Sequence, residues 1–582
     1  MNILGINAYH ADAAACLLVD GKLVAAAEEE RFNRKKHCAG FPRLAIAWCL
    51  REAGLGLKDL DHVAVSRRPW TNLGRRLRFQ LGWIIRSPRF VADRFRSAAQ
   101  TQSVSSDLTA VFPESADEFS GTLHHVEHHV AHAASAFFVS SFDQAAVLSV
   151  DGFGDFSSVL MARGSGRQIQ PLHRVYFPHS LGLFYTAISQ HLGFGHYGDE
   201  GKVMALAGFG KPALLPQMRQ ILISDERGLF QLNLDYFLHH SRGVEMTWGD
   251  ESPTLGRVFS EKLEAALGPA RQPESELTPH HYDIAASLQK RLEEVMFELC
   301  RKLHREVPTE NLAMAGGVAL NSVVNGMIPS QTPFRHLFIQ PAAGDSGTAV
   351  GAAFYVYHEI LEKPRTFQMM NVYAGPRFSE ADCEKALRDA GILFCREEEI
   401  ENVIAKSLAK GRMVGWFQGG MEFGPRALGN RSILAHPGLP KMKTEINARI
   451  KHREAFRPFA PSILLEHAKE YFGERHPSPH MLMVHPFLEG RASRVPAVAH
   501  VDGTGRLQTV TREENPRFYR LIDEFRKLTG IPMLLNTSFN DSEPIVCAPQ
   551  DAIVCFRKSH MDVLVLGNLI AKQDISSDTV IH

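Results

Sequence analysis

The chain has 582 residues, too many for one ordinary domain, and this length indicates two to four domains. Hydrophobic residues make up 45% and charged residues 22% of the sequence, as in globular proteins, and Lys+Arg and Asp+Glu are both 64. The neutral balance favours neither nucleic acid nor a membrane surface as a partner, and no apolar run approaches the ~20 residues that span a bilayer.

The start of the chain and its cysteines bear on the compartment. The first residues, MNILGIN, lack the basic region, apolar core and cleavage site of a signal peptide, so they predict a β-strand instead. The eight cysteines are scattered and include no C-x-x-C motif, and a chain of this length buries a core without disulfides. We therefore expect a cytoplasmic protein with free, buried thiols.

The first predicted elements are three short strands, a helix and a fourth strand. The strands cover residues 2–7, 13–19 and 22–30, with a hairpin signal at Asp20–Gly21. The helix is expected over 42–53 and the next strand over 61–66.

A similar plan recurs later in the chain. A strand is predicted over 145–150, a turn at Asp151–Gly154 and a strand over 157–163. This weak repeat of a hairpin unit suggests a duplicated α/β domain.

A basic segment at Arg67–Arg96 lies between these two patterns. It carries nine Arg and one Asp among Trp, Phe, Leu and Ile residues. Two interpretations stay open: a basic amphipathic surface for a membrane or an anionic substrate, or a helical insertion whose arginines pair with acidic residues elsewhere. We favour the second.

Gly-rich turns that lead into helices characterise residues 311–361. A buried strand is predicted to end in Gly316 and Gly317, with a helix over 318–327, and residues 344–361 again form a turn followed by a helix. Near residues 365–375 a new α/β run begins. We place the boundary there, which gives domains of residues 1–370 and 371–582.

The segment HHVAH is the clearest candidate for a metal site. On a helix, His128 and His132 are four residues apart and share one face, whereas His129 points about 100° away. Asp151 follows at the end of a predicted strand, where carboxylates are common ligands in α/β folds. Two histidines with carboxylate oxygens suit Fe(II), Mn(II) or Zn(II).

The Gly-rich turns are candidates for a nucleotide site. Gly316 and Gly317 let the backbone approach a nucleotide closely. The turn around Gly344 is a second Gly-rich turn before a helix, and it adds Asp345. Lys202 is predicted to sit in a Gly-flanked turn that can meet phosphate oxygens.

The C-terminal half offers cationic side chains on turns, and hydroxyl and amide donors at the end of a buried strand. These residues are Arg426, Arg431, Lys451, Arg453, Arg457, Arg506, Ser538 and Asn540. Together they fit a phosphate and a small planar amide. The alternative, a set of solvated arginines, is weakened by the apolar residues beside them. No nucleophile signature occurs, which favours direct transfer to a bound acceptor over an acyl-enzyme.

Taken in order, ten motifs resemble the O-carbamoyltransferase family of nodulation-factor, cephamycin and aminoglycoside type. They are NAYHADAAACLLVDG with EEERF and KKH, HHVAHAASAFF, VDGFGD, DEGKVMALA, AGGVALN, GDSGTAVGAA, MEFGPRALGNRSIL, FRPFAPS, HVDGTGRLQTV and LLNTSFN. The resemblance implies an α/β fold with a duplicated actin-like N-terminal domain and a YrdC-like C-terminal domain. It also implies that carbamoyl phosphate and ATP, with Mg(II), give carbamoyl adenylate, whose carbamoyl group passes to a hydroxyl of a small-molecule acceptor.

The resemblance further implies roles for residues of this sequence. The ligands of a metal, which is iron in a related enzyme, would be His128, His132, Asp151 and Asp345. The nucleotide in the first domain would be lined by Lys202, Gly316, Gly317, Asn321 and Gly344. Carbamoyl phosphate and ATP in the second domain would be held by Arg426, Lys451, Arg457, Arg506, Ser538 and Asn540. His10 and Asp12 resemble the family's H-x-D at the acceptor site, where either one orients or deprotonates the hydroxyl.

Two other functions stay open. A tRNA threonylcarbamoyl-type transferase predicts a strongly basic chain, which this one is not. A non-catalytic nucleotide-binding protein of the actin-like superfamily does not require the C-terminal cationic residues. We expect no nucleic-acid partner and take a homodimer as the default assembly. The sequence does not identify the acceptor.

Overall fold

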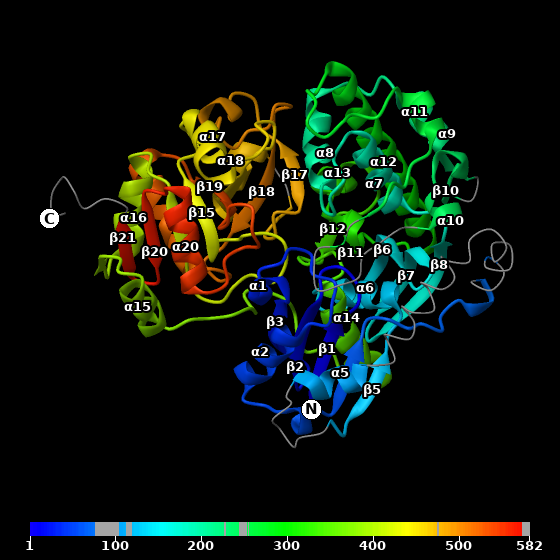
Figure 1. Ribbon diagram of the computed structural model, residues 1–582, viewed down its shortest axis with the longest axis horizontal. Coiled ribbons are helices and arrows are strands. Elements are labelled where there is room, and N and C mark those ends of the chain that lie inside the picture. Colours follow the sequence, from blue (N-terminus) through cyan, green and yellow to red (C-terminus); the bar gives the residue numbers. More distant parts are fainter. Residues whose placement is uncertain are drawn as a thin grey trace. The chain divides into compact units, whose positions relative to one another are not determined.

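The computed structural model describes residues 1–75, 79, 104–111, 119–225, 228–243, 253, 255–473 and 476–572. It divides the chain into two compact units, Met1–Met369 and Met370–His582 (Figure 1). Of the basic segment Arg67–Arg96, only residues 67–75 and Phe79 are described, so most of that prediction lies outside the described residues.

Within its described residues, the first unit contains two five-stranded sheets with the same strand order. One sheet runs β3-β2-β1-β4-β5 and the other β8-β7-β6-β11-β12. In both sheets, neighbouring strands among the first three of this order are antiparallel. The last two strands run parallel to the third one, which is β1 in one sheet and β6 in the other. The strands are β1 (Asn2–Asn7), β2 (Ala14–Val19), β3 (Lys22–Glu28), β4 (His62–Val65), β5 (Thr122–His125), β6 (Gln144–Gly154), β7 (Ser157–Ser165), β8 (Gln168–Tyr176), β11 (Asn311–Ala315) and β12 (His336–Ile339), with a separate hairpin of β9 (Leu222–Ser224) and β10 (Phe230–Leu232). The predicted duplicated α/β fold is confirmed.

Two helices pack against each other between these sheets. Helix α14 contacts β1 and β2, helix α6 contacts β6 and β11, and the two helices touch (Figure 1). Glycines allow this close packing, because a Cβ on Gly351 would lie 1.7 Å from Ala131 O and one on Gly5 would lie 2.2 Å from Ala349 O.

The α-helices of the first unit range in length from one helical turn to about eight turns. They are α1 (Glu30–Asn33), α2 (Arg43–Ala53), α5 (Val104–Val111), α6 (His128–Phe137), α7 (Leu181–His191), α8 (Glu200–Leu206), α9 (Leu215–Ile221), α10 (His239–Arg242), α11 (Glu261–Leu267), α12 (Pro279–Glu306), α13 (Ser322–Gln331) and α14 (Gly347–Tyr355). The predicted helix over 318–327 is in part a 3₁₀ turn, Gly317–Leu320, after which Asn321 caps α13.

The two hairpin turns of the first unit differ in how well the sequence predicts them. Asp20 and Gly21 form the predicted turn, with φ of 48° and 75°. The turn predicted at Asp151–Gly154 is wrong, since β6 continues to Gly154 and the turn is Asp155–Phe156, with φ of 46° and 72°. The Asp155 carboxylate accepts hydrogen bonds from the backbone N–H groups of Arg68 and His128, which fixes the turn at this position.

The part of the second unit that the structure describes is built on one nine-stranded mixed sheet, which confirms the α/β class. Its strand order is β13-β21-β20-β14-β15-β19-β16-β18-β17. The strands are β13 (Phe394–Arg396), β14 (Val414–Phe417), β15 (Arg431–Ala435), β16 (Ala460–Leu464), β17 (Met483–Pro486), β18 (Thr504–Val510), β19 (Met533–Ser538), β20 (Val563–Leu566) and β21 (Leu569–Lys572). The helices are α15 (Glu380–Asp389), α16 (Ile400–Ala409), α17 (Lys441–Ile446), α18 (Ala468–Phe472), α19 (Pro516–Thr529) and α20 (Pro549–Ser559).

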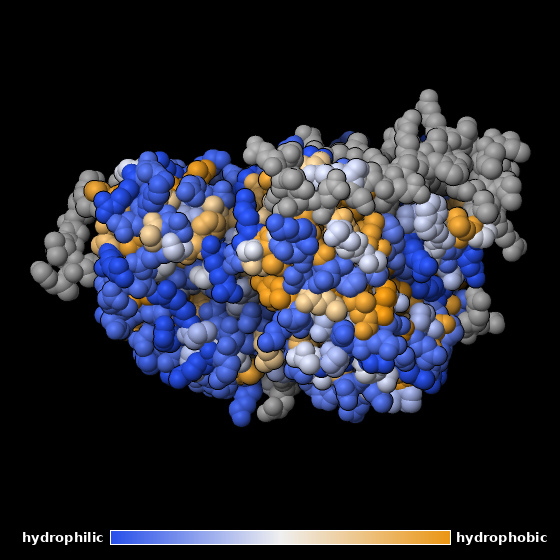
Figure 2. Space-filling model, turned by 90° about the horizontal axis from the view of Figure 1, so that it is seen from below, coloured by the Kyte–Doolittle hydropathy of each residue, from blue (hydrophilic) through white to orange (hydrophobic). Residues whose placement is uncertain are grey.

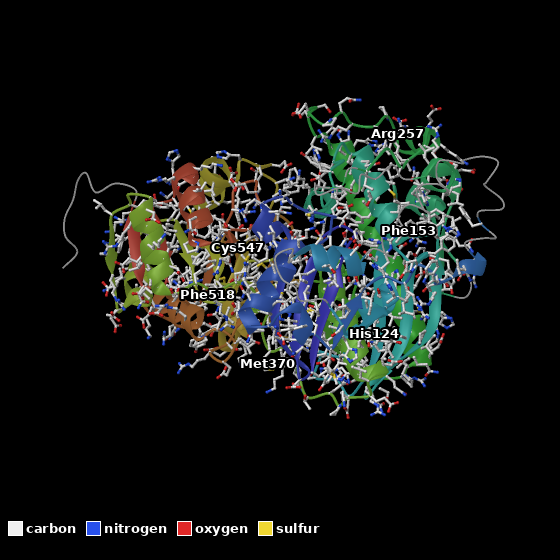
Figure 3. All side chains as sticks on the ribbon, turned by 60° about the horizontal axis from the view of Figure 1, so that its bottom comes forward. His124, Phe153, Arg257, Met370, Phe518 and Cys547 are labelled. Carbon is white, nitrogen blue, oxygen red and sulfur yellow. The ribbon has the colours of Figure 1, made fainter. Side chains whose placement is uncertain are left out.

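A large hydrophobic core fills the second unit, and Val372, Leu428, Ala460 and Met481 form a smaller cluster in the same unit. Phe518 of α19 is fully buried in the large core together with Trp416 of β14 and Phe472 of α18. Figure 3 shows Phe518 and the buried Cys547 among the helices and strands of this unit. The amphipathic pattern of α19, with Phe518, Leu521, Ile522 and Phe525 on its buried face, accounts for its packing.

On the face that Figure 2 shows, most of the coloured surface is hydrophilic and hydrophobic side chains form patches within it. Exposed large hydrophobic residues of the described ranges occur in both units, among them Trp70 and Leu393. Seven of the eight cysteines are buried, and Cys395 is exposed. Within the described ranges, none of the helices has both the length and the apolar character that crossing a membrane requires.

Candidate functional site

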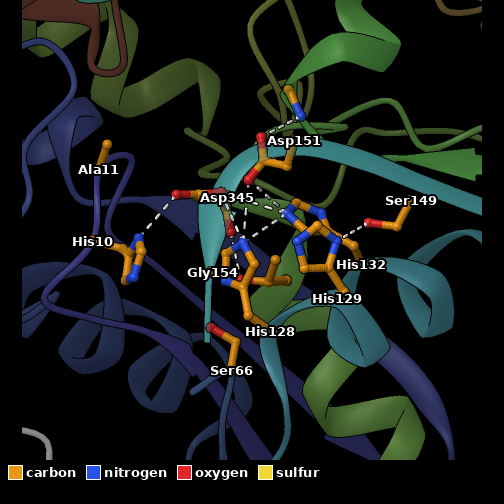
Figure 4. Close-up of polar contacts among 12 residues, drawn as sticks. His10, Ala11, Ser66, His128, His129, His132, Ser149, Asp151, Gly154 and Asp345 are labelled. Atoms are coloured by element: carbon orange, nitrogen blue, oxygen red, sulfur yellow. Dashed lines mark hydrogen bonds and ion pairs between the residues drawn. The ribbon is translucent and has the colours of Figure 1, made fainter. Parts of the chain in front are cut away.

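Four side chains from distant parts of the first unit converge in its interior (Figure 4). The Nε2 atoms of His128 and His132 lie 3.1 Å apart, and each is 3.2–3.5 Å from Asp151 Oδ2 and 3.4–3.5 Å from Asp345 Oδ1. All four residues are buried, and their ligand atoms lie within 4.8 Å of one another. We call this set the His–Asp cluster. Two imidazoles and two carboxylates facing one point are the donor set of a divalent metal site.

Local sequence explains how α6 and β6 present these ligands. The Glu127 carboxylate caps α6 by accepting hydrogen bonds from the N–H groups of His129 and Val130, so the helix begins at His128. In β6 the register breaks between Val150 and Gly154, which leaves residues 151–153 opposite one residue of β7. This bulge turns Asp151 toward α6.

Two glycines then hold the ligands in position. The Gly317 N–H donates a hydrogen bond to Asp151 Oδ1 at 2.8 Å. A Cβ on Gly154 would lie 1.9 Å from Cδ2 of His128, so only glycine leaves room for that ring. The ring of His128 is therefore positioned by packing against the backbone of the bulge.

The negative charges of the two carboxylates in the His–Asp cluster are balanced only when protons or cations are bound beside them. Burial alone would lower the pKa of His128, but the hydrogen bond to Asp151 and the charges of Asp345 and Asp151 raise it to about 9. Burial and Asp151 raise the pKa of Asp345, yet contacts with His10, His128 and His132 bring it to about 2. Burial raises the pKa of Asp151 too, but hydrogen bonds with His128 and His132 outweigh burial and lower it. Both buried carboxylates thus stay ionised and need two positive charges beside them. A divalent cation held by the four side chains supplies those charges, so the residues present fit a metal ion.

His129 lies outside the His–Asp cluster. Its Nδ1 lies 2.8 Å from Ser149 Oγ and its Nε2 lies 3.0 Å from Ser157 O. Burial lowers the pKa of His129 to about 3, so the ring is neutral and its two hydrogen bonds hold α6 against β6 and β7.

The two residues of the H-x-D motif have different neighbours. His10 Nδ1 lies 3.3 Å from Asp345 Oδ2, and the ring stacks on His128 with centroids 5.2 Å apart. Asp12 Oδ1 instead lies 2.7 Å from Nδ1 of His37. His10 therefore adjoins the His–Asp cluster directly, while Asp12 forms a pair with a histidine to which the sequence analysis gave no role.

The glycines predicted for the nucleotide also support the cluster. Gly316 has φ of 96°, and a Cβ there would lie 2.1 Å from Val150 O. Gly316 and Gly317 thus pack on the strand that carries Asp151. Gly344 immediately precedes Asp345, and a Cβ on it would meet Asp12 Oδ2 at 3.7 Å.

Asn321 and Lys202 have their polar groups engaged. Asn321 Oδ1 caps α13 by accepting from Val324 N–H, and its Nδ2 donates to Gln289 Oε1 at 2.9 Å. The predicted turn around Lys202 is wrong, because Lys202 lies inside α8 with Nζ 2.9 Å from Asp199 Oδ1. An acidic residue in the first turn stabilises a helix start, and Glu200 supplies it here.

In the second unit, Lys451 joins two of the predicted donors. Its buried Nζ donates to Ser538 O at 2.7 Å, to Asn540 O at 2.7 Å and to Asn540 Oδ1 at 2.7 Å. It also lies 3.2 Å from Ser538 Oγ. Lys451 therefore fixes the turn that follows β19.

Four arginines of the second unit lie close enough to repel one another. We call them the arginine cluster: Arg426, Arg453, Arg457 and Arg506. Burial and the charge of Arg457 lower the pKa of Arg426 to about 10 and of Arg453 to about 9. Burial, together with the charges of the other three arginines, lowers the pKa of Arg506. The Nε atoms of Arg426 and Arg506 are buried, and no hydrogen-bond partner for them occurs among the described residues. Such a cluster favours a bound polyanion.

Arg431 does not belong to this cluster, which corrects the sequence interpretation. It is fully buried and donates to the backbone carbonyls of Gln418, Asn430 and Pro376. Its guanidinium also lies 3.6 Å from the centroid of the Phe417 ring. Arg431 holds the GPRALG loop onto the sheet.

Comparison with known proteins assigns both units to one family. A family model described as "Carbamoyltransferase N-terminus" matches residues 2–354, and one described as "Carbamoyltransferase C-terminus" matches residues 405–573. The chain is 41% identical to "Uncharacterized protein sll1178" of Synechocystis sp. over 98% of this chain and 96% of that protein. It is 37% identical to "Nodulation protein NolNO" of Sinorhizobium fredii, over 98% of this chain and 80% of that protein. These matches establish that the chain is an enzyme of the carbamoyltransferase family.

Proposed function

We propose that the chain is an ATP-dependent O-carbamoyltransferase that works in two steps. In the second unit, carbamoyl phosphate, ATP and one water molecule give carbamoyl adenylate, phosphate and pyrophosphate. In the first unit, the carbamoyl group passes to a hydroxyl of a small-molecule, natural-product type acceptor, and AMP leaves. The observation that carries the proposal is that the described residues hold two sites of different chemistry, the His–Asp cluster in one unit and the arginine cluster in the other.

The arginine cluster is suited to the first step. Carbamoyl phosphate and ATP, with its Mg(II), bring several phosphate groups, and Arg426, Arg457 and Arg506 offer guanidinium groups whose mutual repulsion an anion relieves. Lys451 fixes Ser538 and Asn540 at the end of β19. In this proposal the small carbamoyl group binds at the Ser538 hydroxyl and the Asn540 amide, which are hydrogen-bonded to each other.

The His–Asp cluster is suited to the second step. His128, His132, Asp151 and Asp345 would hold Fe(II), with Mn(II) or Zn(II) as alternatives. When bound, such an ion supplies a Lewis acid to an oxygen of the carbamoyl adenylate. In this proposal, the acceptor is faced by His10, which contacts Asp345, and by Asp12.

The turns around the cluster complete the first unit's site. We assign the nucleotide part of carbamoyl adenylate to Gly316, Gly317, Asn321, Gly344 and Lys202. A Gly-rich backbone lets a phosphate approach closely, and Lys202 is a cation on the neighbouring helix α8.

Separate measurement of the two steps tests the proposal. Pyrophosphate release that requires carbamoyl phosphate reports the first step, and a mass gain of one carbamoyl group in a library of hydroxylated acceptors reports the second. Arg506→Gln should abolish both, whereas His132→Ala should abolish acceptor carbamoylation and retain pyrophosphate release. Arg388→Gln, at an exposed position of α15, is the matched control. Loss of both readouts in His132→Ala would rule out the division into two sites.

A further inference from the structure

A histidine of the KKH segment is held rigidly beside Asp12. His37 Nδ1 lies 2.7 Å from Asp12 Oδ1, and the His37 backbone N–H donates to Glu30 Oε2 at 2.8 Å. Asp12 and His37 both have left-handed backbone conformations, with φ of 57° and 55°. Non-glycine residues adopt this conformation at an energetic cost, and such strain concentrates at functional sites. The pair is therefore preorganised.

The second ring nitrogen of His37 is accessible. The ring packs edge-on against Tyr197, with centroids 5.1 Å apart. A Cβ on the exposed Gly198 would lie 2.9 Å from His37 Nε2, so the glycine leaves the space in front of this atom open. The side chain of His37 is 33% exposed. A substrate can thus reach Nε2, while Nδ1 is occupied by Asp12.

The pair also adjoins the His–Asp cluster. Asp12 Oδ2 lies beside Gly344, the residue before Asp345. His10, two residues before Asp12, contacts Asp345 at 3.3 Å. His37 and the cluster therefore border one region of the first unit.

We propose that His37 is the catalytic base that takes the proton of the acceptor hydroxyl, with Asp12 as its positioning residue; this inference rests on the proposed function. The acceptor oxygen attacks the carbamoyl carbon of carbamoyl adenylate while its proton moves to His37 Nε2. The bond between that carbon and the phosphate oxygen breaks, and its electron pair leaves with AMP. The proton then passes from His37 to water.

The charges around His37 favour a proton acceptor over an anion site. The groups that face it are Asp12, Glu30, Lys36, Tyr197 and Glu200. Burial would lower the pKa of His37, but Asp12 and Glu30 outweigh burial and the charge of Lys36 and raise it to about 9. Carboxylates on this side stabilise the imidazolium that proton transfer creates, and they repel a phosphate group.

Simple alcohols test this base without knowledge of the natural acceptor. Ethanol and 2,2,2-trifluoroethanol serve as acceptors in the full chain with ATP, carbamoyl phosphate and metal, and the carbamate ester is measured by mass spectrometry. His37→Gln should lower ethanol carbamoylation by about 100-fold or more. The loss with trifluoroethanol should be smaller, because its more acidic hydroxyl depends less on a base. His336→Gln, at an exposed position of β12, is the control.

Two further readouts separate a base from a structural residue. The parent enzyme's carbamoylation rate should rise with pH and level off above about pH 9, and Asp12→Asn should shift this rise to lower pH because it removes the neighbouring carboxylate. Free imidazole should restore activity to His37→Gly. Equal losses with both alcohols, an unchanged pH profile and no rescue by imidazole would overturn the assignment.

Pyrophosphate release in the same samples keeps the two proposals distinguishable. If the parent enzyme forms carbamate esters without releasing pyrophosphate, the adenylate step is wrong. The comparison of the two alcohols still decides the role of His37 in that case, because it depends only on the carbamate product.

Discussion

The backbone N–H of Gly317 donates a hydrogen bond to Asp151 Oδ1 at 2.8 Å and so links the 3₁₀ turn after β11 to strand β6, across 166 residues of sequence. A Cβ on Gly317 would lie 2.8 Å from the same oxygen. Because β11 and β6 are neighbouring parallel strands, their ends meet at one edge of the sheet. The position of a candidate metal ligand is thereby set by a glycine from another strand.

Replacement of Gly154 by alanine should displace His128 and weaken metal binding. The new Cβ would lie 1.9 Å from Cδ2 of the imidazole, so the ring must move out of the His–Asp cluster. We expect metal affinity to fall by about 10-fold or more. Metal bound per chain, measured by mass spectrometry of the purified protein, checks this.

Gly152→Ala is the matched control, because a Cβ on Gly152 meets nothing within 4 Å. It should retain the metal content of the parent protein. Equal metal content in Gly154→Ala would show that the cluster does not depend on the position of His128.

Lys451→Met should destabilise the second unit and prevent the first step. The buried Nζ serves oxygens of both Ser538 and Asn540, and methionine leaves these acceptors unsatisfied. We expect a loss of about 3 kcal/mol in the free energy of unfolding, measured by urea denaturation. Lys441→Met, at an exposed position of α17, controls for loss of a lysine. A stability loss no larger than the control's would contradict this role.

Phosphate should stabilise the protein through the arginine cluster. An anion relieves the repulsion among Arg426, Arg453, Arg457 and Arg506 and binds only the folded chain. We expect the melting temperature to rise with phosphate at constant ionic strength, and this rise to shrink in Arg506→Gln. An equal rise in that variant would place the phosphate elsewhere.

His239 should make the first unit less stable in acid. Its Nε2 donates to Pro178 O at 2.8 Å, and burial lowers its pKa from 6.5 to about 3. The unfolded chain therefore binds a proton that the folded chain does not, so stability is full above about pH 6.5 and falls toward pH 3. This histidine alone accounts for about 2 kcal/mol between pH 7.5 and pH 5. His239→Asn should reduce the pH dependence of the unfolding free energy by that amount; an unchanged dependence would contradict the assignment.

Features with a local cause could be predicted from the sequence. The helical spacing of His128 and His132 and the Asp20–Gly21 hairpin depend on neighbouring residues, and the repeat of the hairpin unit indicated the duplication. The motif order also indicated the family. These patterns carry their information in short stretches of chain.

Features with a distant cause could not be predicted. The bulge at Asp151 depends on contacts with distant residues. The Asp155 carboxylate accepts hydrogen bonds from the backbone N–H groups of His128 and Arg68, and the Gly317 N–H donates to Asp151. Arg431 resembles the other arginines in sequence, yet backbone carbonyls of the folded loop engage it. The pairing of His37 with Asp12 across 25 residues likewise has no sequence signal apart from the KKH segment.

The stoichiometry of the complete reaction tests the two-step transfer most directly. With ATP, carbamoyl phosphate and an acceptor, one AMP and one pyrophosphate should form for each carbamoylated hydroxyl, and none of these products should form when carbamoyl phosphate is omitted. Carbamoylation of the acceptor from carbamoyl phosphate without consumption of ATP would contradict the proposal.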